Sequence, residues 1–172
     1  MPELNETYVV HCAICNCSMG IRDSYAVLEN THGVYLRGQP QMTVADCKDT
    51  NLVNFGGCYS VENPSTQAAA DEIRKQVEEE CPDTFLDTFL NKVTNCFTEG
   101  KKETVQADPS QIAEGQLAVL GECHPCIMSG QDWSEGKDGV ETDGARPVLG
   151  GAKLYCKYGG QIEIVGAGQP EA

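Results

Sequence analysis

The chain contains ten cysteines among its 172 residues, and most of them lie in short clusters with glycine, histidine or proline. Thiolates in such clusters serve three kinds of chemistry: binding of a soft metal ion, redox catalysis, or disulfide formation. The clusters are His11–Cys17, Gly56–Cys58, Cys123–Cys126 and Leu154–Gly160. Because disulfides need an oxidising compartment, the location of the chain decides which chemistry is open to them.

The N-terminal segment predicts no secretory leader, because it carries Glu3 and Glu6 where a signal peptide has basic residues, and no apolar run follows. We therefore expect the chain to begin in the cytosol with reduced thiols. A protein that is exported in its folded form by a dedicated machine would also lack a secretory leader. No stretch of the sequence approaches the roughly 20 apolar residues of a membrane helix, so we expect no stable association with a membrane.

Composition limits the partners and the kind of core. The formal net charge is −14 and the pI is about 4.4, which argues against a nucleic-acid partner, since backbone binding relies on Lys and Arg. Eighteen glycines beside four Phe and one Trp favour short β-elements and tight turns. A chain of this length can form one hydrophobic core without disulfides or metal sites, so small size does not account for the cysteines.

Alternating residues predict a β-strand from Thr7 to Cys17. One face of this strand would carry Cys12 together with Tyr8, Val10 and Ile14, an apolar setting that favours core packing of Cys12 over metal binding. The opposite face would carry His11, Ala13, Cys15 and Cys17.

Two β-hairpins follow from turn-forming residues between apolar runs. Residues 26–28 and 33–36 flank a polar loop that contains His32, which predicts the first hairpin. Residues 153–158 and 161–165 flank a Gly-Gly pair, which predicts a second hairpin closed by a two-residue turn.

The middle of the chain changes to helical character. Good helix formers over residues 67–80, followed by a proline, predict one helix. An apolar stripe between Asp83 and Gly100 predicts a second helix, in which Cys96 packs as a small apolar side chain; we expect the same of Cys81.

These patterns predict a mainly β fold with an inserted α-helical pair. The β body would be discontinuous, formed by residues 1–66 and 117–172, and residues 67–116 would be the helical insertion. Segment 38–66 carries turn formers at short intervals, and we interpret it as an ordered loop.

The spacing of Cys123-His124-Pro125-Cys126 is shared by zinc knuckles and thioredoxin-type redox sites. A redox site would place the pair at the start of a helix, and Gly130 leaves little room for one.

The sequence lacks a Gly-x-Ser-x-Gly elbow, a His-Glu-x-x-His motif and a phosphate-binding glycine loop, so we expect no enzyme. A thiol–disulfide oxidoreductase using Cys123 and Cys126, and a free-standing zinc-binding adaptor, are the alternatives.

A set of short motifs resembles the PAAR-like proteins, in the branch catalogued as a domain of unknown function and found with bacterial contractile injection systems. The motifs are Tyr8-Val9-Val10, Cys17-Ser18-Met19-Gly20, the His32 loop, the run Asp49–Ser60 with Asn63-Pro64, Cys123–Cys126, Trp133 with Gly136, and Leu154–Ile162. Residues 67–116 fall outside the resemblance, and we interpret them as an elaboration of this chain.

The resemblance implies a small cone of β-hairpins that caps the threefold end of a trimeric spike, one copy per trimer, with its apex as the leading point. The protein would be assembled in the cytoplasm and then secreted or injected, with transient contact to the target membrane. Its role would be mechanical, and the insertion would dock an effector or cargo protein.

The resemblance also implies a metal near the apex, zinc or iron. The cysteines inside the matched motifs are the implied ligands: Cys17, Cys58, Cys126 and Cys156. The related proteins use a histidine-rich site, which this chain replaces with cysteine. Disulfides formed after export are the alternative, and the remaining cysteines of the β body are undecided between ligand and core, namely Cys12, Cys15, Cys47 and Cys123.

Overall fold

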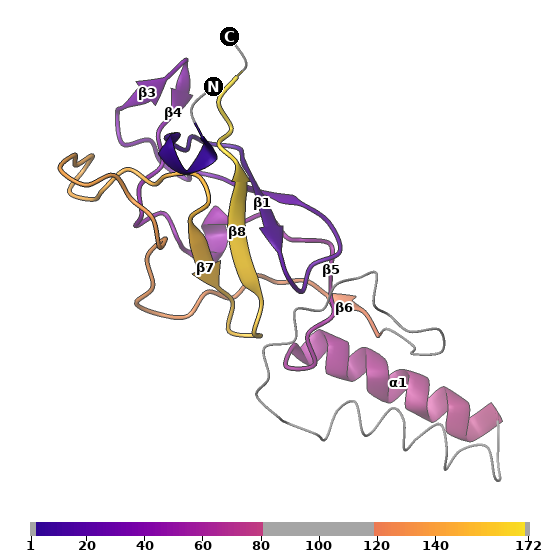
Figure 1. The fold of residues 1–172 in the computed structure, drawn as a ribbon. Helices are drawn as coiled ribbons and strands as arrows, with labels where there is room; N and C mark the ends of the chain where they lie inside the picture. Colours follow the sequence, from indigo (N-terminus) through magenta and orange to yellow (C-terminus); the bar gives the residue numbers. More distant parts are fainter. Residues whose placement is uncertain (1–2, 81–118, 171–172) are drawn as a thin grey trace.

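The computed structural model describes residues 3–80 and 119–170, which form eight short β-strands, two 3₁₀ turns and one α-helix (Figure 1). The mainly β fold predicted from the sequence is confirmed. The elements are η1 Leu4–Glu6, β1 Ala13–Cys17, β2 Ser24–Ala26, β3 Tyr35–Leu36, β4 Gln39–Pro40, η2 Asp49–Asn51, β5 Gly57–Cys58, α1 Pro64–Glu80, β6 Gly121–Glu122, β7 Lys153–Tyr155 and β8 Gln161–Gly166.

The largest sheet has four antiparallel strands in the order β2-β1-β8-β7. Period-two alternation turns Cys15 and Cys17 of β1 into the core, opposite Ile164 and Ile162 of β8. Leu154 of β7 pairs with Ile162 and is also fully buried. Two smaller ribbons, β3-β4 and β5-β6, complete the fold, and Figure 1 places them at opposite ends of the sheet.

Cys12, left undecided between ligand and core, does not lie on a buried strand face. Cys12 has a φ of 66° in a turn closed by the Ala13 N–H, which donates to the Val10 carbonyl at 3.1 Å. This turn interrupts the alternation, so β1 begins only at Ala13 and Cys12 is exposed. Ile14, predicted on the buried face, is 40% exposed.

The first predicted hairpin is also wrong. Ser24–Ala26 pairs with β1, and Tyr35–Leu36 pairs instead with Gln39–Pro40. Arg37 and Gly38 link the latter pair with φ values of 50° and 82°. Two successive positive φ values make the primed turn that suits the twist of a hairpin, which explains why the chain turns here.

The C-terminal hairpin is confirmed as β7 and β8, with a different turn. Tyr155 pairs with Gln161, and the Cys156 N–H donates to the Gly160 carbonyl at 2.8 Å. The Gly159 N–H donates back to the Cys156 carbonyl, and Gly159 has a φ of 80°. The turn is therefore a three-residue loop with a bulge glycine, which sets Cys156 opposite Gly160.

The first predicted helix is confirmed as α1, which begins three residues earlier than expected, at Pro64. Its first turn is fixed to the β5-β6 ribbon. The Thr66 hydroxyl donates to the Cys58 carbonyl at 2.9 Å, and the Glu122 N–H donates to the Ser65 hydroxyl at 2.8 Å. A Cβ on Gly121 would lie 2.2 Å from the Thr66 nitrogen, so only glycine permits this approach. The second predicted helix, with Cys81 and Cys96, lies outside the described residues.

The outer edges of the four-stranded sheet are covered. Gln131 and Ser134 bond the backbone of β7, and the Val53 N–H donates to the Tyr25 carbonyl of β2 at 3.0 Å. Covered edges remove the sites at which another strand would add. Within residues 3–80 and 119–170, no helix has the length and apolar character needed to cross a membrane.

Candidate functional site

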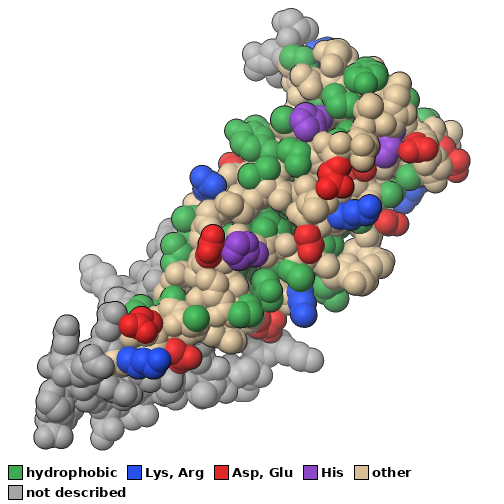
Figure 2. All heavy atoms as spheres, turned by 180° about the vertical axis from the view of Figure 1, so that it is seen from behind, with side chains coloured by type: hydrophobic (Ala, Val, Ile, Leu, Met, Phe, Trp, Pro, Cys, Tyr) green, Lys and Arg blue, Asp and Glu red, His purple; other side chains and the backbone are tan. Residues whose placement is uncertain are grey.

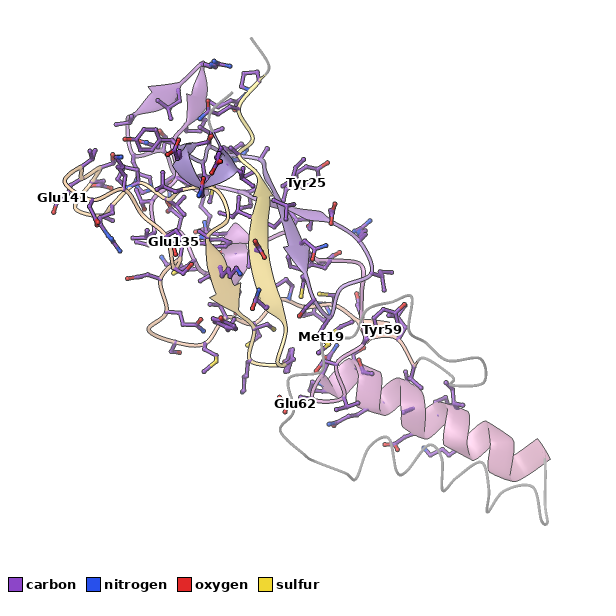
Figure 3. The ribbon with its side chains drawn as sticks, in the orientation of Figure 1. Met19, Tyr25, Tyr59, Glu62, Glu135 and Glu141 are labelled. Atoms are coloured by element: carbon purple, nitrogen blue, oxygen red, sulfur yellow. The ribbon has the colours of Figure 1, made fainter. Side chains whose placement is uncertain are left out.

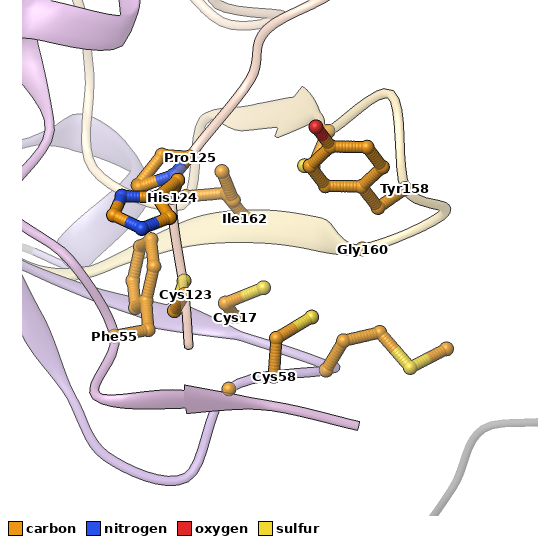
Figure 4. Close-up of a pocket in the computed structure, with 12 residues that line it drawn as sticks. Cys17, Phe55, Cys58, Cys123, His124, Pro125, Tyr158, Gly160 and Ile162 are labelled. Carbon is orange, nitrogen blue, oxygen red and sulfur yellow. The ribbon is translucent and has the colours of Figure 1, made fainter. Parts of the chain in front are cut away.

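Four cysteines from four distant segments line one pocket (Figure 4). Cys17 ends β1, Cys58 lies in β5, Cys123 follows β6, and Cys156 follows β7. Figure 4 shows the side chains of Cys17, Cys58 and Cys123 beside one another, on one side of the hairpin turn that carries Tyr158 and Gly160. The pocket therefore lies where the four-stranded sheet meets the β5-β6 ribbon.

Backbone hydrogen bonds hold these segments in place. Cys58 forms an isolated bridge with Gly20, and the Tyr59 N–H donates to the Met19 carbonyl at 2.9 Å. Met19 and Tyr59 accordingly lie close together near the start of α1 (Figure 3). The Cys123 N–H donates to the Gly56 carbonyl at 3.2 Å. The ends of β1, β5 and β6 are thereby tied together around the thiols.

The β7-β8 turn closes the fourth side of the pocket. Cys156 forms an isolated bridge with Ile127, and the Ser60 hydroxyl donates to the Tyr158 carbonyl. The Gln161 N–H donates to the Ser18 hydroxyl at 2.9 Å. These bonds connect the turn to the segments that carry Cys17 and Cys58.

Gly160 leaves space inside the pocket. A Cβ at this position would lie 2.9 Å from the Cys17 Sγ and 3.6 Å from the Cys156 Cβ. The cavity itself is about 10 Å³, which is the room taken by about one water-sized particle. The pocket is therefore too small for an organic cofactor.

Burial favours the protonated form of two thiols in the pocket, Cys17 and Cys123. Burial raises the pKa of Cys17 from 9.0 to about 11, and the neighbouring thiols Cys123, Cys156 and Cys58 add to the rise against an opposing backbone hydrogen bond. Burial also raises the pKa of Cys123. A thiolate here would need a nearby positive charge, such as that of a metal ion.

We expect the metal-free protein to lose stability as the pH rises above 9. Burial raises the pKa of Cys15 to about 12 and that of Cys17 to about 11. Above 9 the unfolded chain releases these protons first, so each thiol lowers the free energy of unfolding by about 1.4 kcal/mol per pH unit until its folded-state pKa is reached. Urea unfolding at several pH values measures this slope.

Cys15→Ala provides the control, because Cys15 lies outside the pocket and its removal leaves the titration of Cys17 in place. We expect the variant to show the shallower slope over the same pH range. Equal slopes in the two proteins would contradict the assignment of the loss to Cys15.

The donor chemistry of the pocket fits a soft metal ion, since four cysteines line one small pocket. The side chains, however, do not form a ready coordination group: among the described residues, no set of three or more His, Cys, Asp or Glu side chains is placed to hold a metal. The structure thus supplies the donors and the space, and a bound metal is a proposal.

The structure brings together three of the four ligands implied from the sequence. Cys17, Cys58 and Cys156 line the pocket, and Cys126 does not; its carbonyl accepts a hydrogen bond from the Lys157 N–H at 2.7 Å. Cys123, which sequence reasoning left undecided, takes the fourth place. Cys123 is buried next to the exposed Glu122, and the pairing of β5 with β6 brings its segment beside Cys58.

The other described cysteines lie outside the pocket. Cys15 is fully buried in the core of the sheet. The Cys47 thiol donates to the Gln131 carbonyl at 2.9 Å, which gives it a structural hydrogen bond. All eight cysteines of the described ranges are free thiols.

The histidines have separate roles. His11 accepts a hydrogen bond on Nδ1 from the Leu28 N–H at 3.0 Å, and His32 bonds two aspartates. His124 lines the pocket, but its side chain is 72% exposed and lies 3.5 Å from Glu122.

The chain belongs to a family described as a domain of unknown function, DUF4280, whose match spans residues 9–169. All four pocket cysteines lie inside that range. Comparison with curated proteins and with solved structures gave no match.

Proposed function

We propose that this protein is a PAAR-like tip, which caps the threefold end of a trimeric spike in a bacterial contractile injection system with one copy per trimer. The observation that carries the proposal is the convergence of four distant β-segments on one cysteine pocket at one end of a mainly β body. The motif resemblance supports it independently. The protein would be assembled in the cytoplasm and leave the cell with the spike.

A narrow tip has little interior in which to bury apolar side chains, so a crosslink between its strands offsets what the core lacks. We propose that Cys17, Cys58, Cys123 and Cys156 hold one zinc or iron ion. Such an ion stabilises the thiolates that burial alone disfavours, and its binding free energy adds to the folding free energy. This set contains Cys123 in place of Cys126.

The surface supports a protein partner over a nucleic acid. On the face shown in Figure 2, acidic side chains are interspersed with hydrophobic ones, and the Lys and Arg side chains lie apart from one another. Tyr25, Ile14 and Val165 on the outer face of the sheet are 51%, 40% and 45% exposed. We infer that apolar contacts of this kind, rather than basic patches, serve the spike and the cargo.

The insertion is proposed to dock the effector or cargo. Its first helix, α1, leaves the body beside the ribbon that carries Cys58, and points away from the four-stranded sheet (Figure 1). Binding of a second protein to a helix that extends from the body in this way would leave the sheet intact.

Electron microscopy of the assembled spike tests the capping role. We expect spikes assembled with this protein to end in additional pointed density of one copy per trimer, and spikes assembled without it to end bluntly. A blunt spike in the presence of the protein would overturn the proposal, and co-purification without any trimeric partner would favour the zinc-adaptor alternative.

The oxidoreductase alternative has less support. Cys123 is buried with a raised pKa, whereas a redox cysteine needs a depressed one, and Cys123–Cys126 does not begin a helix. We expect iodoacetamide to modify the exposed Cys12 before Cys17 or Cys123, which mass spectrometry of the digested protein would show. Rapid modification of Cys123 with turnover of a disulfide substrate would restore this alternative.

A further inference from the structure

Away from the cysteine pocket, three segments distant in sequence meet at His32. Its Nε2 lies 2.9 Å from Oδ2 and 3.0 Å from Oδ1 of Asp46, and its Nδ1 lies 3.0 Å from Oδ2 of Asp143. The side chains of His32 and Asp46 are 17% and 13% exposed, and that of Asp143 is 70% exposed. The imidazole thus joins a shielded partner to a solvated one.

For both contacts to be hydrogen bonds, Nε2 must donate to Asp46 and Nδ1 must donate to Asp143. A neutral imidazole has one N–H and one lone pair, so it satisfies one carboxylate and turns its lone pair to the other. Only the imidazolium donates to both carboxylates, with charge-assisted hydrogen bonds. The geometry therefore selects the protonated ring.

Asp46 is fixed to the body of the protein. Its Oδ2 accepts from the Thr43 N–H at 2.7 Å and from the Thr43 hydroxyl at 2.9 Å. The carbonyl of Asp46 accepts from the indole N–H of the buried Trp133 at 2.8 Å. The bond between His32 and Asp46 thus anchors the ring to the core.

Asp143 belongs to a separate turn over residues 142–145, where it has a φ of 53°. Thr142 and Ala145 close the turn with hydrogen bonds of 2.8 and 3.1 Å. A second link to the body runs from the Thr142 hydroxyl to Gln41 at a longer 3.3 Å. The backbone bond from the Val44 N–H to the Arg146 carbonyl at 2.9 Å fixes the chain just after the turn, and the bond to His32 is the charged link from the turn itself to the body.

We propose that His32 is a proton-operated clamp, which holds the 142–145 turn against the body as an imidazolium and releases Asp143 as a neutral imidazole. The bond to Asp46 persists in both states, because that carboxylate is fixed and shielded.

The charged groups that face the ring agree with this device. They are Asp46 from the 43–46 turn and Asp143 from the 142–145 turn, while Arg146 of the neighbouring loop pairs instead with Asp138 at 2.8 Å. Burial lowers the pKa of His32, but the bonds and charges of the two aspartates outweigh it, and the net direction is upward from 6.5. The clamp thus stabilises fully below 6.5 and is lost as the pH rises through the raised value.

NMR titration of the imidazole nitrogens tests the clamp in the full chain. We expect the midpoint of His32 to lie above 6.5, and the amide signals of Thr142 and Ala145 to shift with that same midpoint. Asp143→Asn should lower the midpoint, because it removes the exposed carboxylate and leaves Asp46 in place. The exposed position of Asp143 makes this variant mild for folding.

Glu141→Gln is the matched control, since it removes the same charge from the same loop two residues away. We expect it to leave the His32 midpoint unchanged. A wild-type midpoint at or below 6.5, a midpoint insensitive to Asp143→Asn, or amide signals of the turn that ignore the titration would each overturn the clamp.

Discussion

Replacing Trp133 by alanine is expected to lower the free energy of unfolding by about 3–5 kcal/mol, the usual cost of deleting a buried aromatic side chain. Trp133 is the largest fully buried side chain of the described residues and is 1% exposed. It lies in a turn-rich segment, yet its backbone N–H donates to the Val44 carbonyl at 3.0 Å and its indole donates to Asp46. One side chain thus fills the core and fixes the 43–46 turn.

Trp133→Phe separates these two contributions. Phenylalanine keeps most of the buried area and loses the indole N–H, so we expect a loss of about 1–3 kcal/mol from the unpaired Asp46 carbonyl and the smaller ring. Urea denaturation measures both variants. Domains of this size are stable by about 5–15 kcal/mol, so the expected loss for Trp133→Ala is a large part of the total. A loss below about 1 kcal/mol would contradict the role of Trp133 in filling the core and fixing the 43–46 turn.

Gly160→Ala is expected to weaken binding of the proposed metal by about 5- to 150-fold, because overpacking a closely packed site costs about 1–3 kcal/mol. Its Cβ would enter the pocket 2.9 Å from the Cys17 Sγ. The fold should tolerate the change better than the site does, since a cysteine side chain can rotate away from the new methyl group.

Gly159→Ala is the matched control for this experiment. Gly159 has a φ of 80° and no heavy atom within 4 Å of an added Cβ, so alanine strains the backbone without filling the pocket. We expect it to cost about 1 kcal/mol of stability and to leave zinc affinity unchanged. Titration calorimetry with Zn²⁺ compares the two variants, and equal affinities would argue against a metal in this pocket.

Sequence patterns correctly predicted the elements whose formation depends on residues close together in the chain. Helix formers ending at a proline predicted α1, and alternation around a glycine pair predicted the β7-β8 hairpin. The N-terminal strand failed because a turn at Cys12 resets the alternation, and periodicity does not reveal a single residue with positive φ. The Arg37-Gly38 turn was missed for the same reason.

The site depends on contacts that the sequence pattern does not carry. Motifs selected Cys17, Cys58 and Cys156, but choosing between Cys123 and Cys126 required the pairing of β5 with β6. His32 was weighed as a metal ligand or a solvated loop residue, and its two aspartate partners lie 14 and 111 positions away in the chain. Long-range pairs of this kind come from the fold as a whole.

Native mass spectrometry of the purified protein and two serine variants tests the cysteine pocket most directly. We expect one zinc or iron ion per chain in the wild type and in Cys126→Ser, and none in Cys123→Ser, because Cys123 lines the pocket and Cys126 does not. A wild type without metal, or metal that is lost in Cys126→Ser and kept in Cys123→Ser, would contradict the pocket as the metal site.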